Sequence, residues 1–382
     1  MKLSKMRLSL FVVFSLIMIS TLAYGGETVR EKKKFNVIEC SGTPYEIGKQ
    51  YGTACKENIH KSLAMHFGVF KVVYNASKEE ILANAKKFLP AATKFDPELI
   101  EMLKGEAEGA GVSFDEVFAL RCMIEFGEYY NQIKSLCTSF MATGKATKGG
   151  KTIIGQNIDW SPDFPMDLLR IKHSNGLEQL TLAFGGVLEW TMSSAGLGIV
   201  ENLILSPPEQ QRLNIPCGLV IPKAMRQKNI GDALGVFCEA GRGLLYYGLG
   251  SAEGDIIGIE STPDDFCVLQ PKDDILVHTN HYLTPKFQKG DWVYKLGAAD
   301  SYIRVQRIEK IMKKQYGNIT VETMMDALRD HNNYPNAICR HVDKDKPIPF
   351  KTVASIIYDL DEKIMYIAYG NPCKYDYVKY GF

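Results

Sequence analysis

The spacing of apolar residues changes at Cys137, and this change limits the possible folds more than any other feature of the chain. Before it, apolar residues recur every four positions and predict one face of a helix, at Ile47, Tyr51, Cys55, Ile59, Leu63 and Phe67. After it, apolar runs are short, and Leu188, Trp190 and Met192 alternate with polar residues as in a strand. Helices followed by many antiparallel strands, with two further helical stretches, predict an α+β fold of stacked sheets covered by helices.

Local signals place the expected elements. Helices are expected at Glu98–Gly109 and at Ser113–Glu128, where Ser113 is the N-cap and Glu116 its capping-box partner. The polar segment that follows, up to Leu136, is expected to be a loop. Further helical stretches are expected near 221–240 and 301–329. Strands are expected at 137–144, 151–158, 255–261, 266–270, 275–280, 352–360 and 364–370.

A hairpin is expected around Cys137. The segments "CTSFMATG" and "KTIIGQNI" flank a turn-like stretch, Lys145–Gly150, in which Gly149 and Gly150 suit a tight connection. Because a hairpin brings the end of its second strand back beside the start of its first, Asp159 is expected to lie near Cys137.

Composition limits the classes of partner. The 382 residues are 46% hydrophobic and 23% charged, which is ordinary for a globular protein with a large core, and the net charge is +1. Nucleic-acid-binding proteins usually carry a basic excess on one face, so no nucleic-acid partner is expected. Beyond the N-terminal segment, no apolar run is long enough to predict a stable membrane span.

The N-terminus has the pattern of a secretory signal. Basic residues up to Arg7 precede an apolar run, Leu8–Leu22, and Ala23 and Gly25 supply the small residues of a cleavage site. Residues 1–25 are therefore expected to be a signal peptide, with the mature protein secreted or periplasmic. An uncleaved N-terminal anchor is the alternative.

Neither a cofactor nor a metal is expected. The nine cysteines are odd in number and widely spaced, and no C-x-x-C motif predicts a zinc site built on cysteine pairs. His278 and His281 have H-x-x-H spacing, but on a strand these two positions face opposite ways. No G-x-G-x-x-G motif follows a strand, so no dinucleotide site is indicated.

Cys137 is the candidate for chemistry. A cysteine at the start of a strand is most often a small buried apolar residue. Here it is followed by two hydroxyl residues, Thr138 and Ser139, and Asp159 is expected beside it.

The chain resembles a known family in several blocks. "CTSF" (137–140) followed by "GQNIDW" (155–160) is similar to the peptidase C45 family of acyl-CoA:6-aminopenicillanic-acid (isopenicillin N) acyltransferases, which are N-terminal-nucleophile (Ntn) hydrolases. Further blocks follow in the family's order: "GTPYEIGKQYG" (42–52), "VHTNHYL" (277–283), "DSYIRVQR" (300–307), "HNNYPNAICRH" (331–341), "TVASIIYDL" (352–360) and "GNPC" (370–373). The resemblance covers nearly all of the chain after residue 26.

The resemblance implies an αββα sandwich and a chain that cuts itself between Leu136 and Cys137. The products would be a helical part, residues 26–136, and a catalytic part, residues 137–382, which stay associated as the α and β fragments of one precursor. Cys137 would then be the nucleophile, with its own α-amine as base. By match to the family's motifs, Asp159 would hold the α-ammonium and Asn280 would stabilise the oxyanion. Ser261, Thr262 and Thr138 are possible pocket residues, although Ser261 and Thr262 also fit an ordinary turn.

The expected activity is cleavage of a small N-acyl amide through an acyl-enzyme. Leu136 stands where the family's acyltransferase has glycine, and Lys351 is the nearest basic residue before "TVASIIYDL", where that enzyme has arginine. Substrate recognition is therefore not carried over. Three alternatives remain open: a CoA-dependent N-acyltransferase, a papain-like hydrolase that pairs Cys137 with a histidine such as His281, and a non-catalytic secreted binding protein with the same fold.

Overall fold

The computed structural model describes residues 29–129, 136–204, 215–240, 245–262, 265–295, 297–345 and 349–382. The chain divides into two units, Met1–Glu31 and Lys32–Phe382, and the fold below is that of the second. The predicted signal peptide, residues 1–25, and positions 130–135 of the predicted loop lie outside the described residues.

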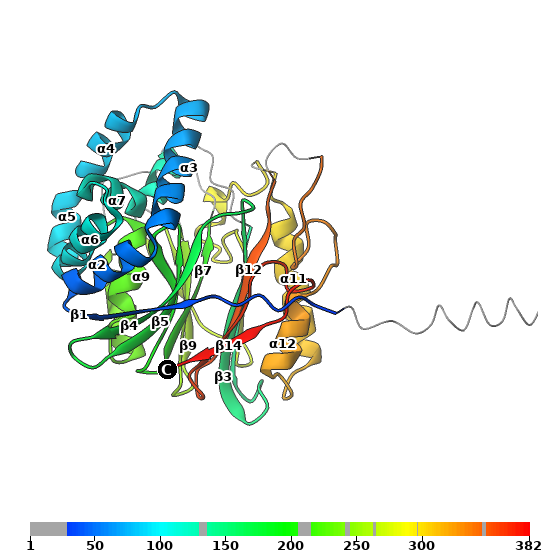
Figure 1. The fold of residues 1–382 in the computed structure, drawn as a ribbon. Coiled ribbons are helices and arrows are strands. Elements are labelled where there is room, and N and C mark those ends of the chain that lie inside the picture. Colours follow the sequence, from blue (N-terminus) through cyan, green and yellow to red (C-terminus); the bar gives the residue numbers. More distant parts are fainter. Residues whose placement is uncertain are drawn as a thin grey trace, which may run out of the picture. The chain divides into compact units, whose positions relative to one another are not determined.

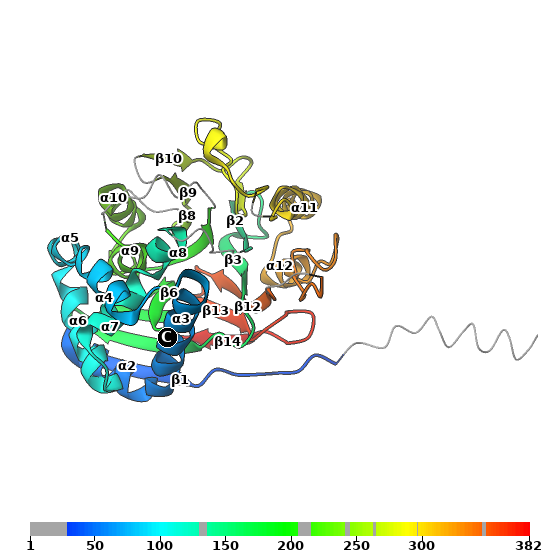
Figure 2. The same cartoon turned by 90° about the horizontal axis from the view of Figure 1, so that it is seen from above.

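Two sheets form the centre of this unit (Figures 1 and 2). The first has eight strands in the spatial order β1 (Val37–Gly42), β4 (Met166–His173), β5 (Glu178–Phe184), β6 (Val187–Ser193), β7 (Leu197–Leu203), β8 (Leu245–Ser251), β9 (Ile256–Ser261) and β10 (Phe266–Leu269). The second has six, in the order β11 (Ile275–His278), β2 (Thr138–Gly144), β3 (Gly150–Trp160), β12 (Lys351–Asp359), β13 (Ile364–Ala368) and β14 (Val378–Gly381).

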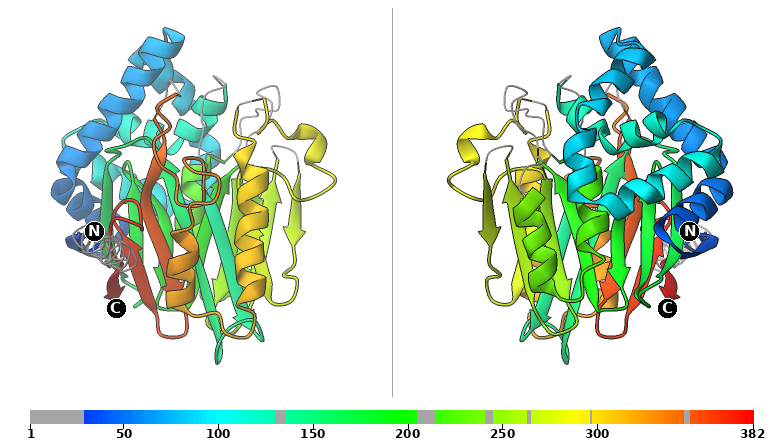
Figure 3. Two further views of the ribbon diagram at one scale, coloured as in Figure 1. Left: turned by 90° about the vertical axis from the view of Figure 1, so that its right-hand side faces the viewer. Right: turned by 90° about the vertical axis from the view of Figure 1, so that its left-hand side faces the viewer.

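Helices cover the outer faces of both sheets, as the two side views in Figure 3 show. Beside the eight-stranded sheet lie α2 (Pro44–Ala54), α3 (Lys56–Tyr74), α4 (Lys78–Lys86), α5 (Leu89–Phe95), α6 (Pro97–Ala110), α7 (Phe114–Arg121), α8 (Met123–Tyr129), α9 (Cys217–Ala224) and α10 (Ile230–Ala240). Beside the six-stranded sheet lie α11 (Asp300–Lys314) and α12 (Val321–Leu328). The short η2 (Gln288–Gly290) lies between β11 and α11 in the chain.

Three apolar cores lie between these layers. Residues on each strand alternate between its two faces, so one strand can contribute to the cores on both sides of its sheet. On β2, Met141 faces the other sheet and packs with Ile154 and Trp190, whereas Phe140 faces α11 and packs with Ile308. The third core lies between the eight-stranded sheet and the helices of the first third. The expected αββα sandwich is therefore confirmed, with one difference: β1 pairs with β4 in parallel, within sheets whose other pairings are antiparallel.

Capping and periodicity signals in the sequence predicted the positions of several elements correctly, but they did not predict where helices are interrupted. The capping box of Ser113 and Glu116 is present, and the strand predicted around Trp190 is β6. The single helices predicted over Ile47–Phe67 and Ser113–Glu128 were wrong, since the first divides at Cys55 and the second at Cys122. The stretches 221–240 and 301–329 each contain two helices as well.

The segments on either side of Cys137 share one core. Ile59 and Leu103, from the helices before it, pack in the same cluster as Leu169 and Ile199 from strands after it. The strand β1 also joins the sheet formed by later strands. Two fragments produced by a cut before Cys137 would therefore remain joined by buried apolar surface.

Among the described helices, none is long and apolar enough to cross a membrane.

Candidate active site

Cys137 lies immediately before β2, between two neighbouring strands. Its place follows from the strand registers: β2 pairs Thr138 with Asn157 of β3, and it pairs Ser139 with His278 of β11. Extending both registers puts Ile158 on one side of Cys137 and Asn280 on the other. The predicted hairpin is confirmed, and Gly149 and Gly150 adopt positive φ angles of 81° and 76° in its turn.

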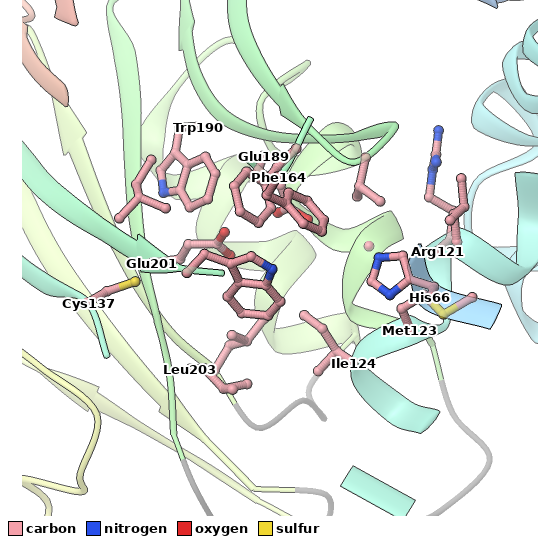
Figure 4. A pocket seen from close by; sticks show the side chains of 17 residues that line it. His66, Arg121, Met123, Ile124, Cys137, Phe164, Glu189, Trp190, Glu201 and Leu203 are labelled. Atoms are coloured by element: carbon pink, nitrogen blue, oxygen red, sulfur yellow. The ribbon is translucent and has the colours of Figure 1, made fainter. Parts of the chain in front are cut away.

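The Cys137 side chain is 3% exposed and lines a cavity of about 750 Å³, counted out to the open solvent at its mouth. Figure 4 shows Cys137 at one side of this lining and Arg121 at the other. The wall is mainly apolar and includes four aromatic side chains in mutual contact, Trp160, Phe164, Phe184 and Trp190. The centroids of the Phe164 and Phe184 rings are 4.2 Å apart. Such a cavity suits an apolar or aromatic group held next to a thiol.

Two carboxyl groups, Glu189 and Glu201, interrupt this apolar wall. Burial, together with the charge of Glu201, raises the pKa of Glu189 well above its usual range. Burial raises the pKa of Glu201 to about 7, and the two side chains share a hydrogen bond. The pair therefore retains a proton near neutral pH. Arg121, also in the wall, forms a buried ion pair with Glu106 at 2.5 Å.

Asp159 lies near Cys137 along the backbone, but its side chain is on the other face of the sheet. Cys137 shares the inner face with Ile158, so Asp159, one residue on, points toward the α11 and α12 side. Its carboxylate accepts hydrogen bonds from Thr352 Oγ1 at 2.7 Å and Arg340 Nε at 3.1 Å. Burial raises the pKa of Asp159 to about 6, against the opposing effect of Arg340 and Arg304.

Asn280 is fully buried next to the cavity. Its Nδ2 donates to the carbonyl of the cavity residue Leu203 at 2.9 Å, and its Oδ1 accepts from Arg304 at 2.9 Å. Its backbone N–H donates to Ser301 Oγ. An amide Nδ2 carries two hydrogens, so one donor position remains beyond the bond to Leu203.

Arg304 connects Cys137, Thr138 and Asn280, and no sequence pattern predicted this role. From α11, its Nη1 donates to the Cys137 carbonyl at 2.5 Å and to Thr138 Oγ1 at 2.9 Å, while Nη2 reaches Asn280. Its Nε donates to Asp300 at 2.8 Å. The block "DSYIRVQR" marked this helix, but an arginine between apolar residues gives no sign that it is buried. Its burial depends on the tertiary contact with β2.

The remaining predicted site residues are placed as follows. The Thr138 hydroxyl accepts from Arg304 on the helix-covered face of β2, opposite the face with Cys137. Ser261 Oγ donates to the carbonyl of Leu245. Thr262 forms a turn with Asp265, whose N–H donates to Thr262 Oγ1. None of the three is in the wall of the cavity described above.

The two H-x-x-H histidines have separate partners. His278 Nε2 is 2.9 Å from Glu260 Oε1, and its ring stacks on Tyr246. His281 Nδ1 is 2.8 Å from Ser301 Oγ. Burial and the nearby charges of His278 and Arg304 lower the pKa of His281 to about 3, so its imidazole is neutral at physiological pH. A different set, His331, Cys339, His341 and Cys373, brings four possible metal ligands together.

A second amide lies on the inner face near Cys137. Asn202, from β7, accepts a 2.6 Å hydrogen bond from Ser139 Oγ, and Ser139 shares the strand face of Cys137. Its buried Nδ2 has no hydrogen-bond partner among the described residues. Sequence reasoning missed Asn202, because its approach to β2 is made across the two sheets.

Known proteins resemble this chain in sequence and in fold. Residues 146–374 match the family described as acyl-coenzyme A:6-aminopenicillanic acid acyl-transferase. The acyl-coenzyme A:6-aminopenicillanic-acid-acyltransferase 40 kDa form of Emericella nidulans is 24% identical over 346 residues, covering 88% of this chain and 92% of that protein. Protein dcd1A of Dictyostelium discoideum is 23% identical over 333 residues, covering 76% and 73%.

Solved structures give a weaker likeness. A conjugated bile acid hydrolase from Clostridium perfringens aligns with a TM-score of 0.44 and 12% identity, covering 64% of this chain and 97% of that one. A penicillin V acylase from Agrobacterium tumefaciens aligns with a TM-score of 0.40 and 14% identity, covering 61% and 83%. The family match spans more than half of the sequence and includes Asp159, Asn280 and Arg304. The chain therefore belongs to the acyl-coenzyme A:6-aminopenicillanic acid acyl-transferase family and is an enzyme.

Proposed function

We propose that this protein is a secreted, self-processing amidohydrolase that removes an apolar acyl group from a small N-acyl amide through a thioester at Cys137. One observation carries the proposal: the Cys137 thiol lies in the wall of a mostly apolar cavity, while its carbonyl is held by Arg304, which also holds Asn280. A nucleophile, an acyl pocket and an aligned amide donor are the parts that acyl transfer needs.

Self-processing begins with the peptide bond between Leu136 and Cys137. The thiol attacks the Leu136 carbonyl, the C–N bond breaks, and the thiol proton passes to the released amine. The product is a thioester between Leu136 and the Cys137 sulfur. Water hydrolyses the thioester, leaves Leu136 with a carboxylate and regenerates the thiol. Cys137 thereby gains a free α-amine.

Turnover uses that amine as the base. A thiol titrates at about 8.5 and an α-amine at about 7.7–8.0, so proton transfer between them is nearly balanced. The thiolate attacks the substrate carbonyl, the amine product leaves with the transferred proton, and water then releases the acid. Asp159 is assigned to the α-ammonium by its match to the family's motif, and its carboxylate lies on the face of the sheet away from the sulfur.

Water is the assigned acceptor of the acyl group. Residues 1–25 have the pattern of a secretory signal, and acyl-CoA is a cytosolic thioester that a secreted enzyme seldom meets. The family's acyltransferases use the same kind of acyl-enzyme, so a CoA-dependent N-acyltransferase is the second candidate. It would show acyl transfer from CoA to an added amine faster than release of the free acid.

The purified protein is expected to contain two fragments, the larger beginning at Cys137. Intact-mass spectrometry and N-terminal sequencing of chain expressed without added protease test this, and a reagent selective for N-terminal cysteine should label the larger fragment. Active protein that is one unbroken chain, with the Cys137 nitrogen still in a peptide bond, would contradict the proposal. It would favour the papain-like alternative, against which the neutral, Ser301-bonded His281 already argues. An inactive single chain would favour the binding-protein alternative.

The aromatic cavity predicts a preference for apolar acyl groups. Each buried methylene contributes about 0.8 kcal/mol, so lengthening the acyl chain from acetyl should raise kcat/KM about fourfold per carbon until the cavity is filled. Kinetics on N-acetyl, N-butyryl, N-hexanoyl and N-phenylacetyl amides of one amine measure this. Phe184→Ala should reduce the rise of kcat/KM with acyl length, because Phe184 lines the cavity. Phe266→Ala, a matched change on β10 outside the cavity wall, should leave that rise unchanged. A series that falls with chain length would contradict the acyl-pocket assignment.

A further inference from the structure

Four possible metal ligands converge outside the cavity. His331, Cys339 and His341 come from the segment between α12 and β12, and Cys373 comes from the segment after β13. The two imidazole nitrogens and two sulfurs all lie within 4.8 Å of one another. His341 Nε2 is 3.0 Å from His331 Nε2, 3.4 Å from Cys373 Sγ and 3.8 Å from Cys339 Sγ.

These distances are close to the edges of a tetrahedral zinc site. With Zn–S near 2.3 Å and Zn–N near 2.0–2.1 Å, tetrahedral geometry puts neighbouring ligand atoms about 3.3–3.8 Å apart. The donors are two imidazoles and two thiols with no oxygen, a set that suits zinc and not magnesium or calcium. We propose that His331, Cys339, His341 and Cys373 bind one structural Zn²⁺ ion.

The surrounding contacts orient the ligands as zinc sites require. Asn371 Nδ2 donates to Cys339 Sγ at 3.6 Å, and also to the Arg340 carbonyl at 2.7 Å. The Cys339 N–H donates to the Asp330 carbonyl at 2.9 Å, and the His341 N–H donates to the Pro335 carbonyl at 3.0 Å. Polar contacts behind the ligands fix their direction and commonly influence metal affinity. With four protein ligands the site is closed, so its role is structural rather than catalytic.

The site is linked to the Cys137 network through Arg340. This residue lies between two of the ligands, Cys339 and His341, and its guanidinium contacts both Asp159 and Asp300. Asp300 in turn accepts from Arg304, which holds the Cys137 carbonyl. A metal that fixes the segment around Arg340 would therefore position Asp159. Arg340 acts here as a positioning residue, through its contacts with Asp159 and Asp300.

The sequence reading did not expect this site because it contains no C-x-x-C motif. The two sulfurs belong to segments separated by the whole β12–β13 hairpin, and only the fold brings them together. Both segments belong to the blocks that resemble the family, "HNNYPNAICRH" and "GNPC", but their shared location is not visible in the sequence.

Metal content of the full-length protein tests the inference. Protein purified without chelator, with zinc supplied during expression and excess removed by gel filtration, should hold about one zinc per chain by inductively coupled plasma mass spectrometry. Cys373→Ser and His331→Ala should each lower zinc retention at least about tenfold after dialysis. Cys267→Ser, a matched change of a partly exposed cysteine on β10, should retain it. Two ligand variants are used because His331 is exposed and can be changed with little risk to folding.

Cobalt gives a second readout that does not depend on activity. Co²⁺ bound in place of zinc should show visible tetrahedral bands and thiolate charge-transfer bands, and Cys373→Ser should weaken the latter. A protein that binds no zinc after reconstitution, zinc that both ligand variants retain, or a Cys339–Cys373 disulfide in freshly purified active protein would each overturn the inference. The measurement does not rely on self-processing, so zinc bound to an uncut chain would support this site while contradicting the proposed function.

Discussion

The Cys137→Ala variant is expected to accumulate as one uncut chain and to hydrolyse no N-acyl amide above the uncatalysed rate. The thiol is the attacking group both in self-cleavage and in turnover, so its removal abolishes both. Cys137→Ser should slow both processes by roughly 10²-fold or more, because a hydroxyl titrates far above a thiol and is a poorer nucleophile at neutral pH. Gel electrophoresis over time follows the cut, and product release follows the turnover.

A loss of fold would not explain that result. Cys137 is small and borders a cavity, so its change to alanine should cost about 1 kcal/mol of unfolding free energy. Thermal unfolding of the uncut variant checks this point. Cys267→Ser serves as the control cysteine and should be cut and active at the normal rate. Normal cleavage of Cys137→Ala at the same bond would refute the assigned nucleophile.

The placement of the backbone around Cys137 could be predicted from sequence because it depends on short-range features. The strand, the Gly149–Gly150 turn and the second strand lie within a single stretch, and turn geometry fixes the register that brings Ile158 beside Cys137. The same reasoning predicted that Asp159 lies near. It could not give the direction of the Asp159 side chain, because that depends on which face of the sheet is covered by α11 and α12.

The residues that hold the site could not be predicted, because their function is set by contacts between distant segments. Arg304 and Arg340 appear in the sequence as ordinary cations, and Arg304 is fully buried only because α11 packs on β2. The sequence has no arginine directly before β12, where the family's acyltransferase has one. In the fold, however, Arg340 lies beside the start of β12, where its N–H donates to Thr352 Oγ1. The parallel pairing of β1 with β4, in which Gly42 lies beside His173, joins segments so far apart in the chain that it was equally invisible in the sequence.

The buried charges near Cys137 form one network, which explains how they are tolerated. Two arginines, Arg304 and Arg340, share Asp300, and Arg340 also contacts Asp159. Removing one member would leave a buried charge uncompensated, and an uncompensated buried charge typically costs about 3–5 kcal/mol. The network therefore makes the position of Asn280 and of the Cys137 backbone rigid before substrate arrives, which is the condition for effective stabilisation of an oxyanion.

Asn280→Ala is expected to lower kcat about 10²–10³-fold and to change KM little. The lost amide donor is assigned to the oxyanion, where charge develops only in the transition state. Self-cleavage passes through a similar oxyanion and should slow as well. Steady-state kinetics on cut protein measure the effect on turnover. The half-time for disappearance of the uncut chain measures the effect on self-cleavage.

The neighbouring amide of Asn202 provides the comparison that makes this prediction decisive. Asn280 also bonds Leu203 and Arg304, so Asn280→Ala can perturb the cavity, whereas Asn280→Asp keeps the oxygen that accepts from Arg304 and replaces the donor with a charged acceptor, which also loses the bond to Leu203. Both variants should lose activity to a similar extent if the donor matters. Asn202→Ala removes an Nδ2 that has no hydrogen-bond partner among the described residues, and it should cost less than about tenfold in activity if Asn280 is the main donor. A larger loss in Asn202→Ala, with Asn280→Asp near normal, would move the oxyanion site to the amide on β7.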